Sequence, residues 1–177
     1  MKKTTSYITF CAIISAVIGA LMATSYFPYL TYAVPAVAGA FIIIPLVETG
    51  KKSAVAVYVV SSVLTLLFAE PEAKLMYLCF FGYYPILKSV LEGIKSRVAE
   101  YILKILAFNC AVSAVYLVLA RLFDISVEGM GDFGKYTVLV LYIMGNIAFI
   151  LYDICLTRIC AMYIIRLHEK IKKIMRF

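Results

Sequence analysis

Residues 7–27 read YITFCAIISAVIGALMATSYF, an unbroken apolar run that decides the fold class. An α-helix rises about 1.5 Å per residue, so this run can cross the roughly 30 Å of hydrocarbon in a lipid bilayer. Small residues recur along one face of the helix, at i, i+3, i+4, i+7, i+8 and i+11. They are Ala12, Ser15, Ala16, Gly19, Ala20 and Ala23, and we refer to them as the small-residue stripe.

The small-residue stripe predicts that another helix packs against the first one. Helices in lipid associate by close packing, and small side chains let two backbones approach each other. The partner is either another helix of the same chain or a second membrane protein.

Further apolar runs predict an all-α, polytopic membrane protein, a bundle of six transmembrane helices in one domain. The whole chain of 177 residues is 64% hydrophobic. The expected helices cover residues 7–26, 33–47, 53–69, 73–91, 98–123 and 136–165, followed by a basic amphipathic tail at 166–177. Pro85 is expected to kink the fourth helix, because proline removes a backbone hydrogen bond. The first run lacks a small-x-small cleavage site, so we expect it to be retained and not removed as a signal peptide.

The distribution of basic residues predicts the orientation. With six spans both termini lie on one side, and 14 of the 17 Lys and Arg residues fall on that side; only Lys74, Arg121 and Lys135 fall opposite. Basic residues accumulate on the cytoplasmic side of membrane proteins, so the termini are expected to be cytoplasmic. We expect a multi-pass protein of a cell membrane, of the prokaryotic plasma-membrane type. Topology and anionic lipid headgroups account for the net charge of +7, without a nucleic-acid partner.

Little in the sequence points to an enzyme. His168 is the single histidine, and there is no phosphate-binding loop or dinucleotide-binding glycine motif. The five cysteines lie in or near apolar runs without a CxxC pair, which is typical of apolar packing residues. We therefore expect no catalytic residues, no metal site and no cofactor.

Polar residues inside the spans are few, and polar groups in lipid are candidates for function. Asn109 lies near the middle of the fifth span. In the sixth span Tyr142, Asn146, Phe149 and Asp153 share one helical face, which is expected to point into the bundle or towards water.

This polar face has two interpretations. As structural groups, Asn109 and Asn146 join two helices, and Asp153 pairs with a basic residue. The basic residues at its depth are Lys88, Lys104 and Arg158. As functional groups, the outer residues Tyr142 and Asn146 line a ligand pocket together with the uncharged, tyrosine-rich connector 26–32. The tyrosines of that connector could equally form an interfacial aromatic belt.

The layout resembles the substrate-binding S component of energy-coupling factor (ECF) transporters. The shared features are the chain length, six spans with both ends inside, the pair Ala12-x-x-x-Ala16 in the first helix, and a second helix rich in Pro, Ala and Gly, Val34-Pro-Ala-Val-Ala-Gly39. The resemblance implies a binding subunit that takes up a micronutrient. Such a subunit docks on a transmembrane T component energised by two cytoplasmic ATPases.

The resemblance also implies positions for both sites. Docking would use the alanine face of the first helix, at Ala12, Ala16 and Ala20. The ligand site would lie near the outer surface, at Tyr29, Tyr32, Tyr77, Tyr116, Tyr142 and Asn146. The outer half of the bundle holds no deep charge, so a neutral or weakly charged ligand is expected. Two alternatives remain open, a membrane scaffold protein without a small ligand and a small self-sufficient transporter or channel.

Overall fold

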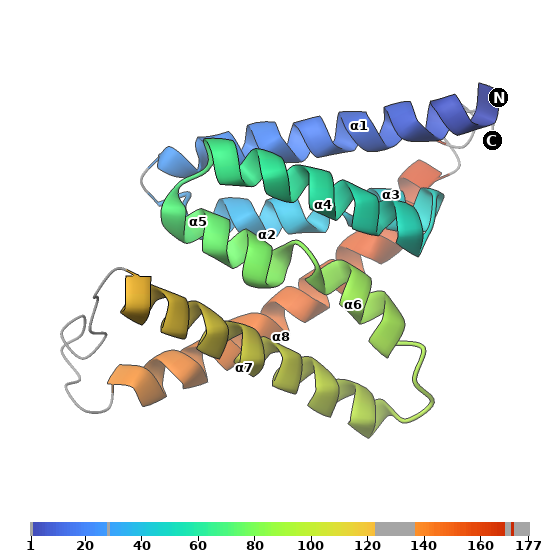
Figure 1. Cartoon of the computed structure of the whole chain (residues 1–177). Coiled ribbons are helices and arrows are strands. Elements are labelled where there is room, and N and C mark those ends of the chain that lie inside the picture. Colours follow the sequence, from blue (N-terminus) through green and yellow to red (C-terminus); the bar gives the residue numbers. More distant parts are fainter. Residues whose placement is uncertain (1, 28, 123–136, 169–170, 172–177) are drawn as a thin grey trace.

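The computed structural model describes residues 2–27, 29–122, 137–168 and 171, and the all-helical fold predicted from the sequence is confirmed for them. The elements are α1 (Lys2–Ala23), η1 (Thr24–Tyr26), α2 (Ala33–Ala40), α3 (Ile43–Glu48), α4 (Lys51–Phe68), α5 (Pro71–Met76), η2 (Tyr77–Phe81), α6 (Tyr84–Leu91), α7 (Arg97–Leu122), α8 (Thr137–Tyr163) and η5 (Ile164–His168) (Figure 1). The expected helix start at 136 and most of the predicted basic tail lie outside the described residues.

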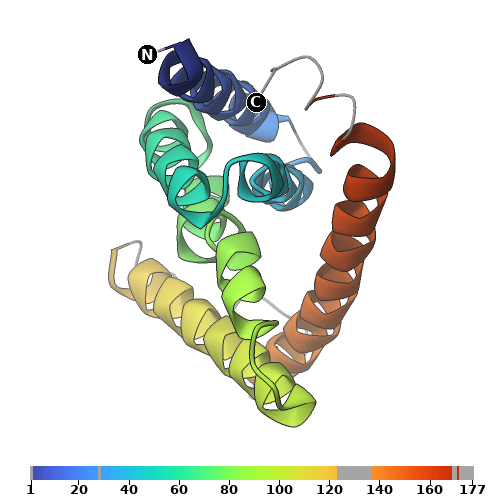
Figure 2. The ribbon, with the colours of Figure 1, turned by 90° about the vertical axis from the view of Figure 1, so that its right-hand side faces the viewer.

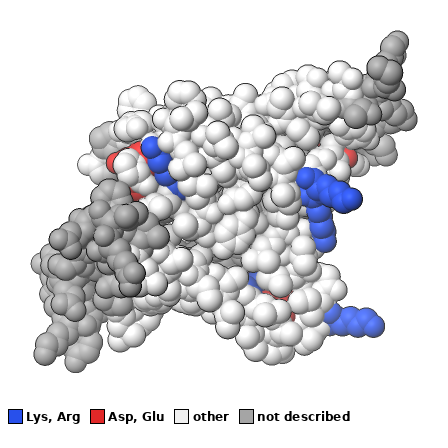
Figure 3. All heavy atoms as spheres, in the orientation of Figure 1, with Lys and Arg blue, Asp and Glu red and all other residues white. Residues whose placement is uncertain are grey.

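Four of the described helices are long and apolar enough to cross a membrane: α1, α4, α7 and α8 with η5. The other two expected spans are divided into shorter pieces. Residues 33–47 form α2 and α3, and residues 73–91 form α5, the π-helical turn η2 and α6. On the face shown in Figure 3, most charged side chains lie towards the ends of the molecule, and the surface between them is largely uncharged apart from a small group in the lower middle of the view. This surface is compatible with a membrane location.

Two prolines account for the divided segments. Pro45 has no N–H for the carbonyl of Phe41, and α2 ends there; the Ile44 N–H donates to that carbonyl instead, at 3.1 Å. Pro85 in the same way has no N–H to donate to the carbonyl of Phe81. The helix is interrupted at Gly82–Tyr83, before α6 begins. The interruption thus precedes Pro85 by two to three residues, because the proline disturbs the turn before it.

The free carbonyl of Phe81 faces Gly39 on α2. A Cβ atom added to Gly39 would lie 2.3 Å from that oxygen, so only glycine permits this approach. The backbone at the interruption after Phe81 therefore packs against Gly39, and α2 lies directly against η2.

The N-terminal half is organised by the pair α1 and α4, which lie side by side (Figures 1 and 2). Ile14, Ile18 and Met22 form the buried face of α1. The partner face of α4 is built from small and polar residues, which allow close packing. These are Ala54, Val57, Ser61, Ser62 and Thr65.

The C-terminal helices α7 and α8 cross each other in Figure 1 and form an open V in Figure 2. A second buried core joins them to η2 and α6. It consists of Ile43, Phe80, Tyr84, Phe108, Ala111, Phe149 and Leu156. The candidate site lies at this junction.

Candidate ligand cavity

An apolar cavity of about 470 Å³ lies where α2, α5–η2, α7 and α8 meet, and we call it the aromatic cavity. Its lining residues are Tyr32, Ala36, Met76, Phe80, Phe81, Phe108, Ala111, Val112, Val115, Gly145, Ala148, Phe149 and Tyr152. Measured along the helix axes at about 1.5 Å per residue, the lining residues of α7 lie before its end at Leu122 and those of α8 lie after its start at Thr137, all by about 10 to 22 Å. The size and mainly apolar lining are typical of small-molecule sites.

Phe80 is the centre of the aromatic wall. Its ring centroid lies 5.1 Å from that of Phe108 and 5.6 Å from that of Phe149, both in edge-to-face geometry. Phe108 and Phe149 stack on each other, with centroids 4.7 Å apart and planes inclined by 10°. Phe81 meets Tyr152 edge to face at 4.9 Å. Such contacts hold the rings in fixed orientations, so the wall is built before a ligand arrives.

Small side chains make the space beside this wall. Ala36 comes from α2, Ala111 from α7, and Gly145 and Ala148 from α8. A Cβ added to Gly145 would meet the ring of Phe108 at 3.5 Å, an ordinary contact distance. Alanine is therefore tolerated at Gly145, whereas a larger side chain would press against the Phe108 ring of the cavity wall.

Two hydroxyl groups supply the polar chemistry of the described lining. The Tyr32 hydroxyl donates to Glu72 Oε2 at 3.0 Å, and this bond raises the pKa of Tyr32 above its usual value. The Tyr152 hydroxyl donates to the carbonyl of Ala36 at 3.4 Å, which is long for such a bond. Tyr32 is more than half exposed and Tyr152 is half-buried, so they lie at the rim and in the wall, respectively.

A second apolar cavity, of about 370 Å³, lies between α2, α3 and α8. Ala36 and Tyr152 line both cavities, so the Tyr152 ring stands between them. The second cavity draws on fewer elements and fewer rings. The aromatic cavity is therefore the better candidate site.

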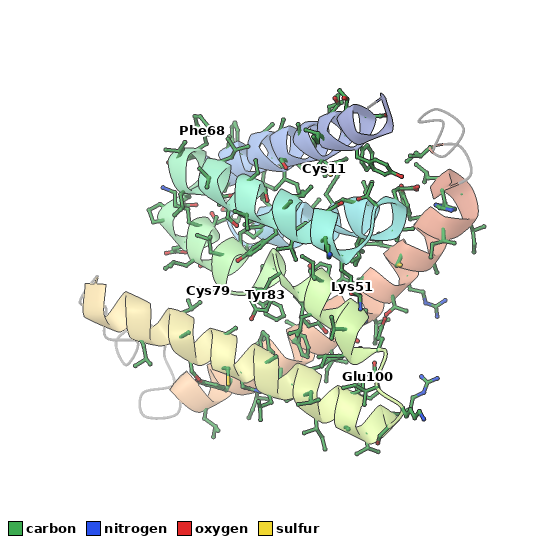
Figure 4. The ribbon with its side chains drawn as sticks, turned by 45° about the vertical axis from the view of Figure 1, so that its right-hand side comes forward. Cys11, Lys51, Phe68, Cys79, Tyr83 and Glu100 are labelled. Carbon is green, nitrogen blue, oxygen red and sulfur yellow. The ribbon has the colours of Figure 1, made fainter. Side chains whose placement is uncertain are left out.

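An ionic network lies directly beneath the aromatic wall and joins α6, α7 and α8. Lys88 Nζ lies 2.5 Å from Asp153 Oδ1 and 2.9 Å from Glu92 Oε1. Lys104 Nζ lies 2.7 Å from Glu100 Oε1 and 3.4 Å from Asp153 Oδ2. Figure 4 labels Glu100 near the start of α7, beside the end of α6.

The network balances its buried charges. Lys88, Lys104, Glu100 and Asp153 are all buried, whereas the Glu92 side chain is 44% exposed. Asp153 thus lies between Lys88 and Lys104, two of the three partners named from the sequence. A buried charge without a partner is strongly destabilising, so these groups fix the packing of the three helices.

Asn109 and Asn146 bond to each other across α7 and α8. Each amide nitrogen donates to the other side-chain oxygen at 3.1 Å. One turn away, the hydroxyls of Ser113 and Tyr142 lie 2.7 Å apart. Tyr142 and Asn146, which the sequence predicts at a ligand site, belong to this polar seam and are not among the residues that line the aromatic cavity.

The other predicted ligand residues are dispersed. Tyr29 is 96% exposed, and Tyr77 is fully buried beside Ser61, with 2.7 Å between the two hydroxyls. The side chain of Tyr116 lies outside the described residues. Of the five expected ligand residues whose side chains are described, Tyr32 alone lines the aromatic cavity.

The residues that dominate the cavity were not singled out as ligand residues from the sequence. They are Phe80, Phe81, Phe108 and Tyr152, with Phe149 noted only as part of the polar face. The sequence offered two patterns that could have pointed to the cavity. One is the adjacent pair Phe80–Phe81, and the other is the spacing of three residues between Phe149 and Tyr152. Phenylalanine in an apolar helix is usually a packing residue, so these signals needed the tertiary structure to be interpreted.

The small-residue stripe is divided between two environments. Ser15 and Gly19 are buried, and a Cβ on Gly19 would lie 3.0 Å from Leu64 of α4. Ala12, Ala16 and Ala20 are exposed. Part of the stripe therefore packs inside the chain, and the three alanines named for docking lie on its surface.

Comparison with known proteins gives no match among protein-family models, curated proteins or solved structures. Within the described residues no group of three or more His, Cys, Asp and Glu side chains could hold a metal ion.

Proposed function

We propose that the protein is a membrane-embedded binding subunit for uptake of a small, neutral or weakly charged micronutrient. The observation that carries this proposal is the aromatic cavity, which is of ligand size and has no charged side chain among its described lining residues. Six crossings would be made by α1, α2–α3, α4, α5–η2–α6, α7 and α8, with both termini in the cytoplasm. In this orientation the aromatic cavity lies towards the outer side and the ionic network towards the inner side.

The topology can be tested separately with introduced cysteines. Glu72 lies at the start of α5 on the proposed outer side, and Ser96 precedes α7 on the inner side; both are exposed. In a cysteine-free background, an impermeant thiol reagent added to intact cells should label Glu72→Cys and spare Ser96→Cys. The reverse pattern would invert the orientation and place the cavity on the cytoplasmic side.

Coupling to a transmembrane partner and two ATPases would use the exposed alanines of α1. Ala12, Ala16 and Ala20 lie one helical turn apart and leave room for the backbone of another helix. Ala16→Leu would separate the two backbones by a side chain while leaving the buried face of α1 untouched. The matched control is Val59→Leu, on the exposed surface of α4.

The experiment is purification in mild detergent followed by mass spectrometry of the proteins that accompany the chain. Wild type and Val59→Leu should retain an ATPase pair, and Ala16→Leu should lose it while remaining monodisperse. If no ATPase accompanies the wild-type chain, the coupled-uptake proposal fails. If Ala16→Leu itself aggregates, the docking role of this face is wrong.

A second candidate function is favoured by the same exposed alanines. A membrane scaffold protein would use them for a permanent partner or for a second copy of the chain, with no small ligand. Recovery of one stable membrane partner, without ATPases or a bound small molecule, would support this alternative.

A further inference from the structure

We infer that the aromatic cavity selects a flat, uncharged aromatic molecule. This inference rests on the proposed function and names the class of ligand. Six of the thirteen lining side chains are aromatic, and the rings in the wall are locked by contacts with each other. Ring faces and edges carry opposite partial charges, so a fixed aromatic wall favours a ligand whose own rings can stack or meet it edge to face.

The cavity disfavours charge. Its described lining contains no Asp, Glu, Lys, Arg or His, and the nearby ionic network is occupied by its own internal pairs. An ionised ligand would lose its water without gaining a countercharge, which costs far more than burial of a neutral ring. Weakly charged ligands, allowed by the sequence alone, are therefore disfavoured by the lining.

The composition of the lining favours a flat ligand. The free space is beside the stacked pair Phe108 and Phe149, next to the small residues Ala111, Gly145 and Ala148. Met76 adds an adaptable thioether, which makes favourable contacts with aromatic edges. A planar molecule can lie between these small residues and the aromatic wall.

One hydrogen bond is available to the ligand. The Tyr152 hydroxyl holds the Ala36 carbonyl only at 3.4 Å, so it can turn to a polar atom on the ligand with little loss. By contrast, the Tyr84 hydroxyl already donates a hydrogen bond of 2.6 Å to Asp153 in the ionic network. The expected ligand thus has a fused or conjugated ring system and a single neutral polar edge.

Three probes of one carbon skeleton separate these properties: naphthalene is flat and neutral, decahydronaphthalene is neutral but puckered, and 2-naphthoate is flat but anionic. The full chain in detergent is heated with each probe. At a concentration about 100 times its dissociation constant, naphthalene should raise the unfolding temperature by roughly 5 °C. Decahydronaphthalene and 2-naphthoate should each bind at least about tenfold more weakly.

Variants show whether the shift in unfolding temperature comes from binding in the cavity. They also correct for the effect of probe dissolved in the detergent micelles. Gly145→Leu crowds the Phe108 ring of the cavity wall and should abolish the naphthalene shift; leucine also favours helix more than glycine does. Ala148→Leu serves the same purpose if Gly145→Leu does not fold. Phe108→Leu keeps an apolar wall but removes a ring, and should weaken naphthalene selectively. Phe68→Leu, on the exposed surface of α4, is the control for the loss of a phenylalanine.

Other outcomes overturn the inference. Equal or stronger binding of decahydronaphthalene would show a merely apolar space. Stronger binding of 2-naphthoate would show a charged ligand. Neither result bears on the coupling to a partner, which is tested separately by recovery of the ATPase pair. A phospholipid that co-purifies with wild type but not with Gly145→Leu would assign the cavity to an acyl chain. A naphthalene shift that persists in both filled variants would place binding elsewhere.

Discussion

The hydroxyl of Tyr84 donates a hydrogen bond of 2.6 Å to Oδ1 of Asp153, and both residues are buried. The ring of Tyr84 packs against the aromatic wall. Its centroid lies 4.8 Å from that of Phe80 and 5.3 Å from that of Phe149. One side chain thus connects the lining of the aromatic cavity to the ionic network. This connection predicts that the two regions are energetically coupled.

Tyr84→Phe should lower the free energy of unfolding by about 1.5 to 3 kcal/mol, the usual contribution of a hydrogen bond to a charged group. The ring and its packing are retained, so the loss reports the hydroxyl alone. Thermal unfolding in detergent measures it, with the 96% exposed Tyr29→Phe as control. Equal stability of the two variants would mean that the Asp153 carboxylate does not depend on Tyr84.

The ionic network predicts a partial rescue. Lys88→Met alone leaves Asp153 short of a partner and should cost about 3 to 5 kcal/mol. The double variant Lys88→Met, Asp153→Leu removes one charge of each sign and leaves Lys104 with Glu100. It should be more stable than Lys88→Met, as judged by unfolding of all four members of the double-mutant cycle. Strict additivity of the two single losses would show that the pair does not interact.

The fit between α2 and η2 predicts that Gly39 accepts no side chain. In Gly39→Ala the new Cβ would lie 2.3 Å from the Phe81 oxygen, so α2 must move away or the variant must unfold. We expect a loss of about 1 to 3 kcal/mol, as for overpacked cores. Gly145→Ala is the control, since its Cβ meets Phe108 at 3.5 Å and alanine favours helix. If both variants unfold at the same temperature, the Gly39 contact is not tight in solution.

The paired amides of α7 and α8 predict non-additive losses. Asn146→Leu removes the partner of Asn109 and should cost about 0.6 to 2 kcal/mol. Adding Asn109→Leu should cost little more, because the amide left unpaired by the first change is also removed. The cycle is measured by unfolding in detergent. Ligand binding is expected to survive Asn146→Leu, since Asn146 does not line the aromatic cavity.

Local sequence patterns predicted the elements better than the site. Apolar runs and prolines sufficed for an all-helical chain and for a disturbance near Pro85, because helix length and the missing proline N–H are local properties. The division of residues 33–47 into α2 and α3 was not predicted. Which side of an apolar helix faces inward is not local. Tyr77 packs beside Ser61 rather than towards the outer surface, and no periodicity marks this in a helix that is apolar all round.

The aromatic cavity depends on contacts between distant segments. Phe80 meets Phe149 only because the Phe81 carbonyl can approach Gly39 and because the α7 and α8 helices cross beside η2. The ionic network was partly foreseeable, since Lys88 and Lys104 lie at the depth of Asp153 and a buried carboxylate requires a partner. The hydrogen bond from Tyr84 to Asp153 was not foreseeable, because a tyrosine in a transmembrane span has many possible partners.

A ligand site in the aromatic cavity is tested by identifying the small molecules that co-purify with this protein from cells. Wild type and Gly145→Leu are purified in parallel in mild detergent, and their denatured extracts are compared by mass spectrometry. A neutral aromatic compound should be recovered with wild type, in a ratio approaching one per chain, and should be absent from Gly145→Leu. Equal recovery of every small molecule from the two proteins, after growth in rich medium, would contradict a ligand site in the aromatic cavity.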